Sequence, residues 1–281
     1  MSANRLKLNA EKTELMWAGT RHTIASLLRL HDPTLTLGTD LVKAADAVRV
    51  LGVLFTPDLA LDKHVTTVSA KCFFQLRQLR RVRRSLDHES TATLVHAFVT
   101  SRIDYGNALL ANAPRTTTDK LQRVLNAAAR VITATRKFDR GLTHILHDEL
   151  HWLDVPQRVA FKLCTTVYKC LHGLAPQYLS ELCVPVGDIA GRRQLRSASR
   201  GLLHFPRYNM TTYGRRAFSY AGHHAWNFLP ENIRNSTSMA IFKRSLKTFY
   251  SSRLRIQRIR DDLRVMGYTS VGLLSNSNSN S

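Results

Sequence analysis

Apolar residues recur at helical spacing early in the chain. They are Leu61, Val65, Val68, Cys72, Leu76 and Leu79, and the intervals between them are 4, 3, 4, 4 and 3 residues. These intervals place the side chains on one face of an α-helix. Asp87 is well placed to cap a second helix, whose apolar positions are Leu94, Val95, Phe98 and Val99. The pattern therefore predicts a helical hairpin over residues 61–104.

Three more helices follow from the same reasoning. Thr118 or Asp119 is a candidate cap for a helix with an inner face of Leu121, Val124, Leu125, Ala128 and Ile132. Residues 156–172 form the next, with proline at its start and glycine just after its end. The last begins near Ser238, with apolar positions Phe242, Leu246 and Phe249, and the arginine-rich run to residue 260 is compatible with its continuation.

The first 60 residues have a different pattern. Residues 12–18 and 48–55 have the short apolar character of strands, and Thr56-Pro57-Asp58 ends the second. We expect a mainly α-helical fold with a small β element at the N-terminus, α+β overall. The expected division is a mixed segment (1–60), a helical region (61–140), a helical C-terminal region containing a basic loop at 187–216 (141–255), and a basic stretch ending in a disordered Ser/Asn tail (256–281).

The charge balance favours a polyanionic partner. Lys and Arg number 41 against 20 acidic residues, a net charge of +21 with an isoelectric point near 10.6. The excess grows from +1 over residues 1–60 to +7 over 61–150 and +13 over 151–281, and arginine outnumbers lysine 30 to 11. Arginine is suited to phosphate because its planar guanidinium donates several hydrogen bonds. Nucleic acid is the first candidate partner and an anionic membrane surface the second.

Cysteine spacing and hydropathy limit the remaining classes. The four cysteines, Cys72, Cys164, Cys170 and Cys183, have no zinc-knuckle spacing and are expected to be reduced and packed in the core. No run approaches the ~20 apolar residues that span a bilayer, and the N-terminus lacks an apolar signal core. We expect an intracellular protein, nuclear or cytoplasmic, without a membrane segment.

Arginines form a second stripe on the first predicted helix. Arg77, Arg80, Arg81 and Arg84 recur at i, i+3, i+4 and i+7, and their centre lies about 150° from the apolar face. One face can then be buried while the other stays positive and exposed. Arg83 departs from the stripe toward the apolar side. A solvated charged face or a nuclear-import patch explains the same stripe equally simply.

Two other basic groups are candidates for phosphate contact. On the predicted helix after residue 118, the basic side is Lys120, Arg123 and Arg130. The loop at 187–216 contains Arg192, Arg193, Arg196, Arg200, Arg207, Arg215 and Arg216. Its neighbouring aromatics, Phe205, Tyr208, Tyr213 and Phe218, are suited either to stacking on single-stranded RNA or to anchoring the loop on the core. Trp152 and Trp226 are expected to pack in the core.

Six segments in order resemble the C-terminal part of reverse transcriptases from non-LTR (LINE-type) retrotransposons, including the jockey type. They are 6–19 (LKLNAEKTELMWAG), 101–110 (SRIDYGNALL), 120–132 (KLQRVLNAAARVI), 151–158 (HWLDVPQR), 168–179 (YKCLHGLAPQYL) and 225–234 (AWNFLPENIR). The resemblance implies the end of a palm, a thumb and the helical region that follows. It also implies that the arginine stripe contacts a template–primer duplex through its phosphates.

The resemblance implies no complete active site. The intact family is an RNA-directed DNA polymerase that uses Mg²⁺ held by clustered carboxylates, and its aromatic-Ala-Asp-Asp turn does not occur here. The only Asp-Asp pair, Asp261-Asp262, lies in a basic, helix-like stretch and is interpreted as a solvated pair. Lys12 resembles the family's general acid and would be dormant. We therefore expect no catalytic residue, no metal and no cofactor.

The hypothesis from sequence is a truncated reverse transcriptase that binds RNA, RNA–DNA hybrid or DNA without reading its sequence. Neither a membrane nor a protein partner is expected. Two alternatives stay open. The chain is a piece of an active polymerase whose catalytic part is encoded upstream, or it is a decayed element with no biochemical role.

Overall fold

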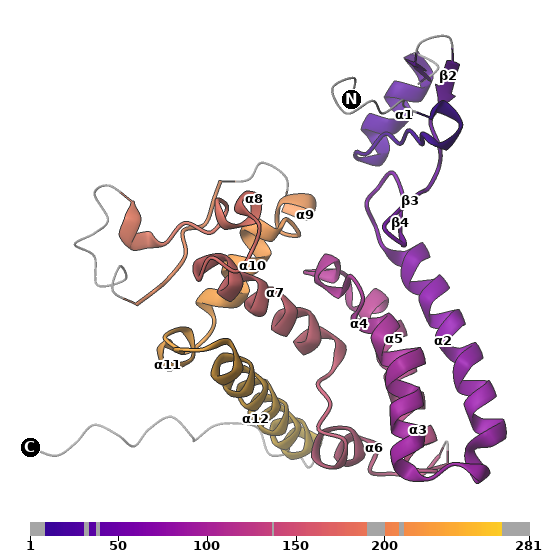
Figure 1. The fold of residues 1–281 in the computed structure, drawn as a ribbon, viewed down its shortest axis with the longest axis vertical. Helices are drawn as coiled ribbons and strands as arrows, with labels where there is room; N and C mark the ends of the chain where they lie inside the picture. The colour runs from indigo at the N-terminus through magenta and orange to yellow at the C-terminus, as the bar shows by residue number, and fades with distance from the viewer. Residues whose placement is uncertain are drawn as a thin grey trace, which may run out of the picture. The chain divides into compact units, whose positions relative to one another are not determined.

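The computed structural model describes residues 9–30, 34–37, 40–136, 138–189, 200–207 and 211–265. The chain divides into two compact units, residues 1–139 and 140–281. Both consist mainly of helices, and the strands lie near the N-terminus of the first unit (Figure 1). The predicted fold class, mainly α-helical with a small β element at the N-terminus, is confirmed. The finer division at residues 60 and 255 stays a prediction.

The N-terminal β element consists of two separate antiparallel hairpins. Strand β1 (Thr34–Leu37) pairs with β2 (Asp40–Lys43), and β3 (Val48–Val50) pairs with β4 (Val53–Phe55). The single strand predicted over 48–55 is wrong, because Leu51 and Gly52 both have positive φ, 47° and 84°, and turn the chain back. The tip is held by the Tyr105 hydroxyl, which donates to the Leu51 carbonyl at 2.6 Å.

The strand predicted over residues 12–18 is also wrong. The chain forms a 3₁₀ turn, η2 (Ala10–Lys12), and then a single bridge between Leu15 and Ala44. The Asn9 carbonyl accepts from the Lys12 N–H and the Thr13 hydroxyl, so a local turn takes the hydrogen bonds that a strand would offer to a neighbour. Helix α1 (Arg21–Leu30) follows, and the sequence pattern did not predict it.

The predicted helical hairpin over residues 61–104 is confirmed, with irregular turns in its second arm. Its elements are α2 (Asp62–Val82), η3 (Arg83–Ser85), α3 (His88–Val95), the π-helical turn η4 (His96–Thr100) and α4 (Ser101–Asp104). Asp87 caps α3 as predicted, accepting from the Ser90 N–H at 2.8 Å, and hydrogen bonding from the Ser90 side chain, and then from its N–H, lowers the pKa of the Asp87 carboxyl. Phe98 was expected to face inward but is exposed.

Helix α5 (Arg115–Ile132) lies beside α2 and completes the core of the first unit (Figure 1). It follows the 3₁₀ turn η5 (Asn107–Leu110). The inner face predicted for α5 is buried throughout, and that of α2 is buried except for a half-buried Val68. The predicted caps Thr118 and Asp119 are wrong because Pro114 precedes the helix and its carbonyl accepts from the Thr117 and Thr118 N–H groups.

The second unit contains shorter helices around two long ones. Its elements are α6 (Leu142–His144), η6 (Ile145–Glu149), α7 (Val155–Leu171), α8 (Gln177–Ser180), η7 (Val186–Asp188), α9 (Thr211–Gly214), α10 (Phe218–Asn227), α11 (Glu231–Arg234) and α12 (Met239–Val265). Helix α7 has Pro156 in its first turn and ends before Gly173, at φ 68°, as predicted. Helix α12 continues through the arginine-rich run, and the predicted Ser/Asn disorder lies outside the described residues.

An aromatic cluster forms the core of the second unit. The Phe242 ring of α12 lies 4.5 Å from that of Tyr168 on α7 and 5.7 Å from that of Trp226 on α10. The Trp226 indole N–H donates to the Gly201 carbonyl at 2.9 Å, which ties the irregular segment at 200–207 to this core. The prediction that Trp152 and Trp226 pack in the core is confirmed, since both are buried.

All four cysteines are free and buried, as predicted. Burial raises the pKa of Cys72 to about 11 and that of Cys164 to about 12, so both remain neutral thiols at neutral pH. None of the helices in the described part of the chain is both long and apolar enough to cross a bilayer.

Candidate nucleic-acid interface

Helix α2 separates a buried apolar face from an exposed arginine face. Val65, Cys72, Leu76 and Leu79 are buried against the rest of the first unit. On the opposite side the four predicted arginines are all exposed: Arg77, Arg80 and Arg81 lie on α2, and Arg84 lies in the 3₁₀ turn η3 that follows it. With a rise of about 1.5 Å per residue in α2 and about 2.0 Å in the 3₁₀ turn, Arg77 and Arg84 lie roughly 10–12 Å apart along the axis. We call this surface the α2 arginine face.

The α2 arginine face is not neutralised by the protein. Among the residues that the structure describes, none of the four guanidinium groups forms an ion pair or a hydrogen bond. Elsewhere, Arg115 pairs with Asp119 and Arg255 pairs with Asp148. The face therefore has four fixed positive charges in one stripe, each with its hydrogen-bond donors available to an external anion.

Arg83 has a different role from its four neighbours. Its guanidinium donates to the carbonyls of Val131 and Ile132 at 2.9 Å each, and to that of Leu86 at 2.8 Å. The last carbonyls of a helix have no partner within the helix, and a positive charge there also interacts favourably with the helix dipole. Arg83 thus caps the C-terminus of α5 and fixes the end of α2 against it, which positions the α2 arginine face.

The N-terminal end of α2 is fixed by a histidine. The Leu54 N–H of β4 donates to His64 Nδ1 at 3.3 Å. Burial, and then the charges of Arg49 and Lys71, lower the pKa of His64. The imidazole is therefore neutral at pH 7 and free to accept this hydrogen bond. Both ends of α2 are consequently anchored, one by His64 and the other by Arg83.

The three basic residues predicted on α5 have separate environments. The Lys120 ammonium donates to the Thr66 hydroxyl of α2 at 3.0 Å, so Lys120 lies next to α2. Arg123 is exposed, whereas Arg130 is half-buried and its Nε has no hydrogen-bond partner within the described residues. The structure brings Lys120 to the helix of the arginine face, and it does not place Arg130 on an exposed surface.

The basic loop is described only in part. Arg192, Arg193 and Arg196 lie outside the described residues. Arg200 and Arg207 are exposed in the second unit, and the Arg200 carbonyl accepts from the buried Arg234 Nε at 3.0 Å. Of the predicted stacking aromatics, Phe205 packs 5.3 Å from the Tyr220 ring and 6.3 Å from the His223 ring, which favours anchoring. Tyr208 lies outside the described residues.

Neither Lys12 nor the aspartate pair has the local structure that a polymerase site would give it. Lys12 is exposed at the end of η2, and its N–H bonds to Asn9. Asp261 and Asp262 belong to α12, not to a turn between strands. Within the described ranges, no three His, Cys, Asp or Glu side chains are grouped as a metal site requires. A helical aspartate pair does not match the carboxylate cluster between strands that holds magnesium in the family that the sequence resembles.

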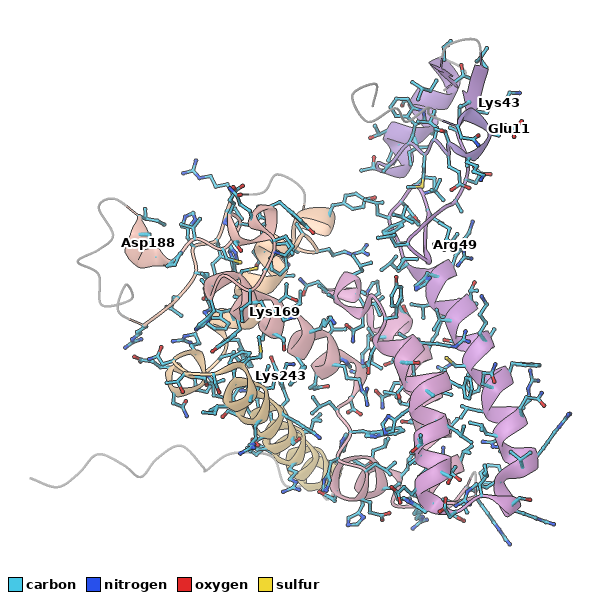
Figure 2. All side chains as sticks on the ribbon, viewed as in Figure 1. Glu11, Lys43, Arg49, Lys169, Asp188 and Lys243 are labelled. Atoms are coloured by element: carbon cyan, nitrogen blue, oxygen red, sulfur yellow. The ribbon has the colours of Figure 1, made fainter. Side chains whose placement is uncertain are left out.

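Two features were not predicted from the sequence. One lies next to the α2 arginine face, and the other lies in the second unit. Phe73 and Phe74 are exposed on α2, one turn before Arg77. A second set of exposed basic residues lies in the other unit: Lys243, Arg244 and Lys247 on α12, and Lys169 on α7. Figure 2 labels Lys169 and Lys243. Both signals were present in the sequence: the phenylalanines depart from the apolar spacing of α2, and the α12 residues recur at i, i+1 and i+4.

Comparisons with known proteins add no relative. No protein-family model, no curated protein and no solved structure matches the chain. The resemblance to reverse transcriptases therefore depends on the six sequence segments alone.

Proposed function

We propose that this protein binds RNA, RNA–DNA hybrid or DNA without sequence preference, through phosphate contacts made by Arg77, Arg80, Arg81 and Arg84. One observation supports this above the others: four exposed guanidinium groups lie in one stripe and have no acidic partner among the described residues. Exposed guanidinium groups are hydrated, and an anionic partner can replace this water with stronger, charge-assisted hydrogen bonds.

The geometry favours phosphates over base edges. Arginines at i, i+3, i+4 and i+7 form a line along the helix, whereas base readout needs side chains that enter a groove at defined depths. One strand of duplex DNA has a phosphate for about every 3.4 Å of the duplex axis, and because the strand winds around that axis its neighbouring phosphates lie further apart, so a stripe of roughly 10 Å can reach two to three phosphates. Backbone contacts of this kind bind any sequence.

The sequence resemblance supports the same role. In LINE-type reverse transcriptases the corresponding region would be the thumb, which holds the template–primer duplex. Because the polymerase carboxylates do not occur in this sequence, we propose binding without nucleotidyl transfer, with Lys12 dormant. An intracellular site of action, nuclear or cytoplasmic, is part of the same proposal.

The test measures binding of the purified chain to labelled RNA hairpin, RNA–DNA hybrid and duplex DNA. Each nucleic acid is used in two unrelated sequences, and binding is measured by fluorescence anisotropy across a salt series. Four phosphate contacts from the α2 arginine face give a slope of about −3 to −4 in log K against log salt, and each further contact adds about 0.9. We expect a steep slope in this range and equal affinity for the two sequences of each pair. No binding by a chain that circular dichroism shows to be folded would contradict the proposal, as would a strong preference for one sequence.

A further inference from the structure

Two exposed phenylalanines adjoin the α2 arginine face. Phe73 is 39% exposed and Phe74 is 50% exposed. They precede Arg77 by four and three residues, so both rings are surface neighbours of that arginine on the helix. Phosphate contacts alone give these rings no role, and exposing two adjacent rings to water is unfavourable.

Phe73 also lines an open hollow on α2. The hollow has a volume of about 460 Å³ and is lined by Ala70, Phe73, Leu76, Arg77 and Arg80. Three of its lining residues are apolar and the other two are arginines, so the hollow combines apolar and positively charged side chains. Such a surface suits a flat apolar group that is attached to an anion.

The faces of the two rings are available to a ligand. Within the part of the chain that the structure describes, neither Phe73 nor Phe74 stacks on another aromatic ring or on a guanidinium group. By contrast, Phe228 is half-exposed but already has Arg253 over its ring at 4.4 Å. Phe73 and Phe74 are therefore rings beside a strong positive charge that the protein leaves unstacked.

We propose that Phe73 and Phe74 form a base-stacking site, and that the α2 arginine face holds unpaired nucleotides of a single-stranded nucleic acid in addition to duplex backbone. The proposal rests on the proposed function, because it needs phosphates at Arg77 and Arg80. A nucleotide combines a flat apolar base with an anionic phosphate, which matches a hollow lined by apolar and basic side chains. Duplexes keep their bases stacked inside, whereas a single strand can turn a base onto an aromatic ring.

The test compares ring removal with ring retention. Phe73→Leu with Phe74→Leu keeps apolar, helix-favouring side chains but removes both π-faces. Phe73→Tyr with Phe74→Tyr keeps the rings, and Phe98→Leu removes an exposed ring elsewhere in the first unit as the matched control. Each folded variant is titrated with unstructured single-stranded RNA and DNA oligonucleotides and with RNA–DNA hybrid, across a salt series.

We expect the double leucine variant to bind both single strands about 10-fold more weakly, as loss of stacking on one base predicts. Its salt slope and its affinity for hybrid should not change, and the tyrosine and Phe98 variants should bind as the unaltered chain does. The proposal is overturned if the leucine variant binds single strands normally, or if it loses single strands and hybrid equally. In either case steep, salt-dependent binding by the unaltered chain still upholds the proposed function, whereas no binding at all would overturn both.

Discussion

Replacing Arg83 with alanine is expected to lower the free energy of unfolding of the first unit by about 2–4 kcal/mol. Three hydrogen bonds from one guanidinium are lost, and the carbonyls of Val131 and Ile132 are left without that donor. Loss of the charge at the α5 C-terminus adds to the effect. Urea unfolding measures the total, and hydrogen exchange of the α5 amides locates it.

Arg84 is the matched control for Arg83. It is adjacent in sequence but exposed, and it forms no hydrogen bond among the described residues. Arg84→Ala should therefore change stability by about 0.5 kcal/mol or less. Arg83→Lys keeps the charge but not the planar set of donors, so it should fall between the two. Equal stability of the Arg83→Ala and Arg84→Ala variants would rule out the capping role.

Replacing Trp226 with alanine is expected to destabilise the second unit by about 3–5 kcal/mol. The side chain is 2% exposed, packs on Phe242, and donates to the Gly201 carbonyl. Its loss creates a cavity and releases the segment at 200–207 from the core. Urea unfolding can be followed through the fluorescence of Trp152, which remains in the same unit.

Two further variants separate the contributions of Trp226. Trp226→Phe keeps an aromatic ring but removes the indole N–H, so it should cost about 0.5–1.5 kcal/mol for the lost hydrogen bond, plus a smaller packing loss than that of alanine. His224→Ala changes an exposed neighbour on the same helix and should cost less than about 1 kcal/mol. A small effect of Trp226→Ala would mean that the aromatic cluster does not hold the second unit together.

The helices were predictable where their determinants are local. The α2 seam from Val65 to Leu79 and the inner face of α5 follow from spacing alone, because periodicity within one helix needs no tertiary information. Asp87 was recognised as a cap for the same reason. The predicted start of α5 was too late. Thr118 and Asp119 are plausible caps, but Pro114 comes before both of them, and the helix already begins at the next residue, Arg115.

The errors at the N-terminus and the irregular turns have other causes. Leu51 is an unusual residue at positive φ, so the β3–β4 turn lacks the common Asn-Gly signal. The hydrogen bond from Tyr105 to Leu51 stabilises that turn from 54 residues away, which no local pattern contains. The π-helical turns η4 and η6 likewise have no counterpart in apolar spacing.

The candidate interface was predicted in part. Helical geometry separated Arg83 from its four neighbours, but the α5 carbonyls that it binds lie 48 and 49 residues downstream. The sequence therefore indicated that Arg83 differs without indicating what it does. Phe73 and Phe74 lie roughly 60° and 160° around the helix from Leu76. Their position off the apolar seam was a signal, and only the structure shows that both rings are exposed.

The measurement that tests the central claim most directly is the salt dependence of RNA–DNA hybrid binding for two matched variants. One replaces Arg77, Arg80, Arg81 and Arg84 with alanine. The other replaces Lys169, Lys243, Arg244 and Lys247 with alanine, which removes the same number of exposed charges from the second unit (Figure 2). Alanine favours helix, so both chains should remain folded.

If the α2 arginine face holds the phosphates, its variant should show a slope shallower by about 3 to 4, since each lost contact contributes roughly 0.9. The second variant should change the slope by less than about 1. Equal flattening of the two slopes would assign binding to overall charge. An unchanged slope for the α2 variant would contradict the account.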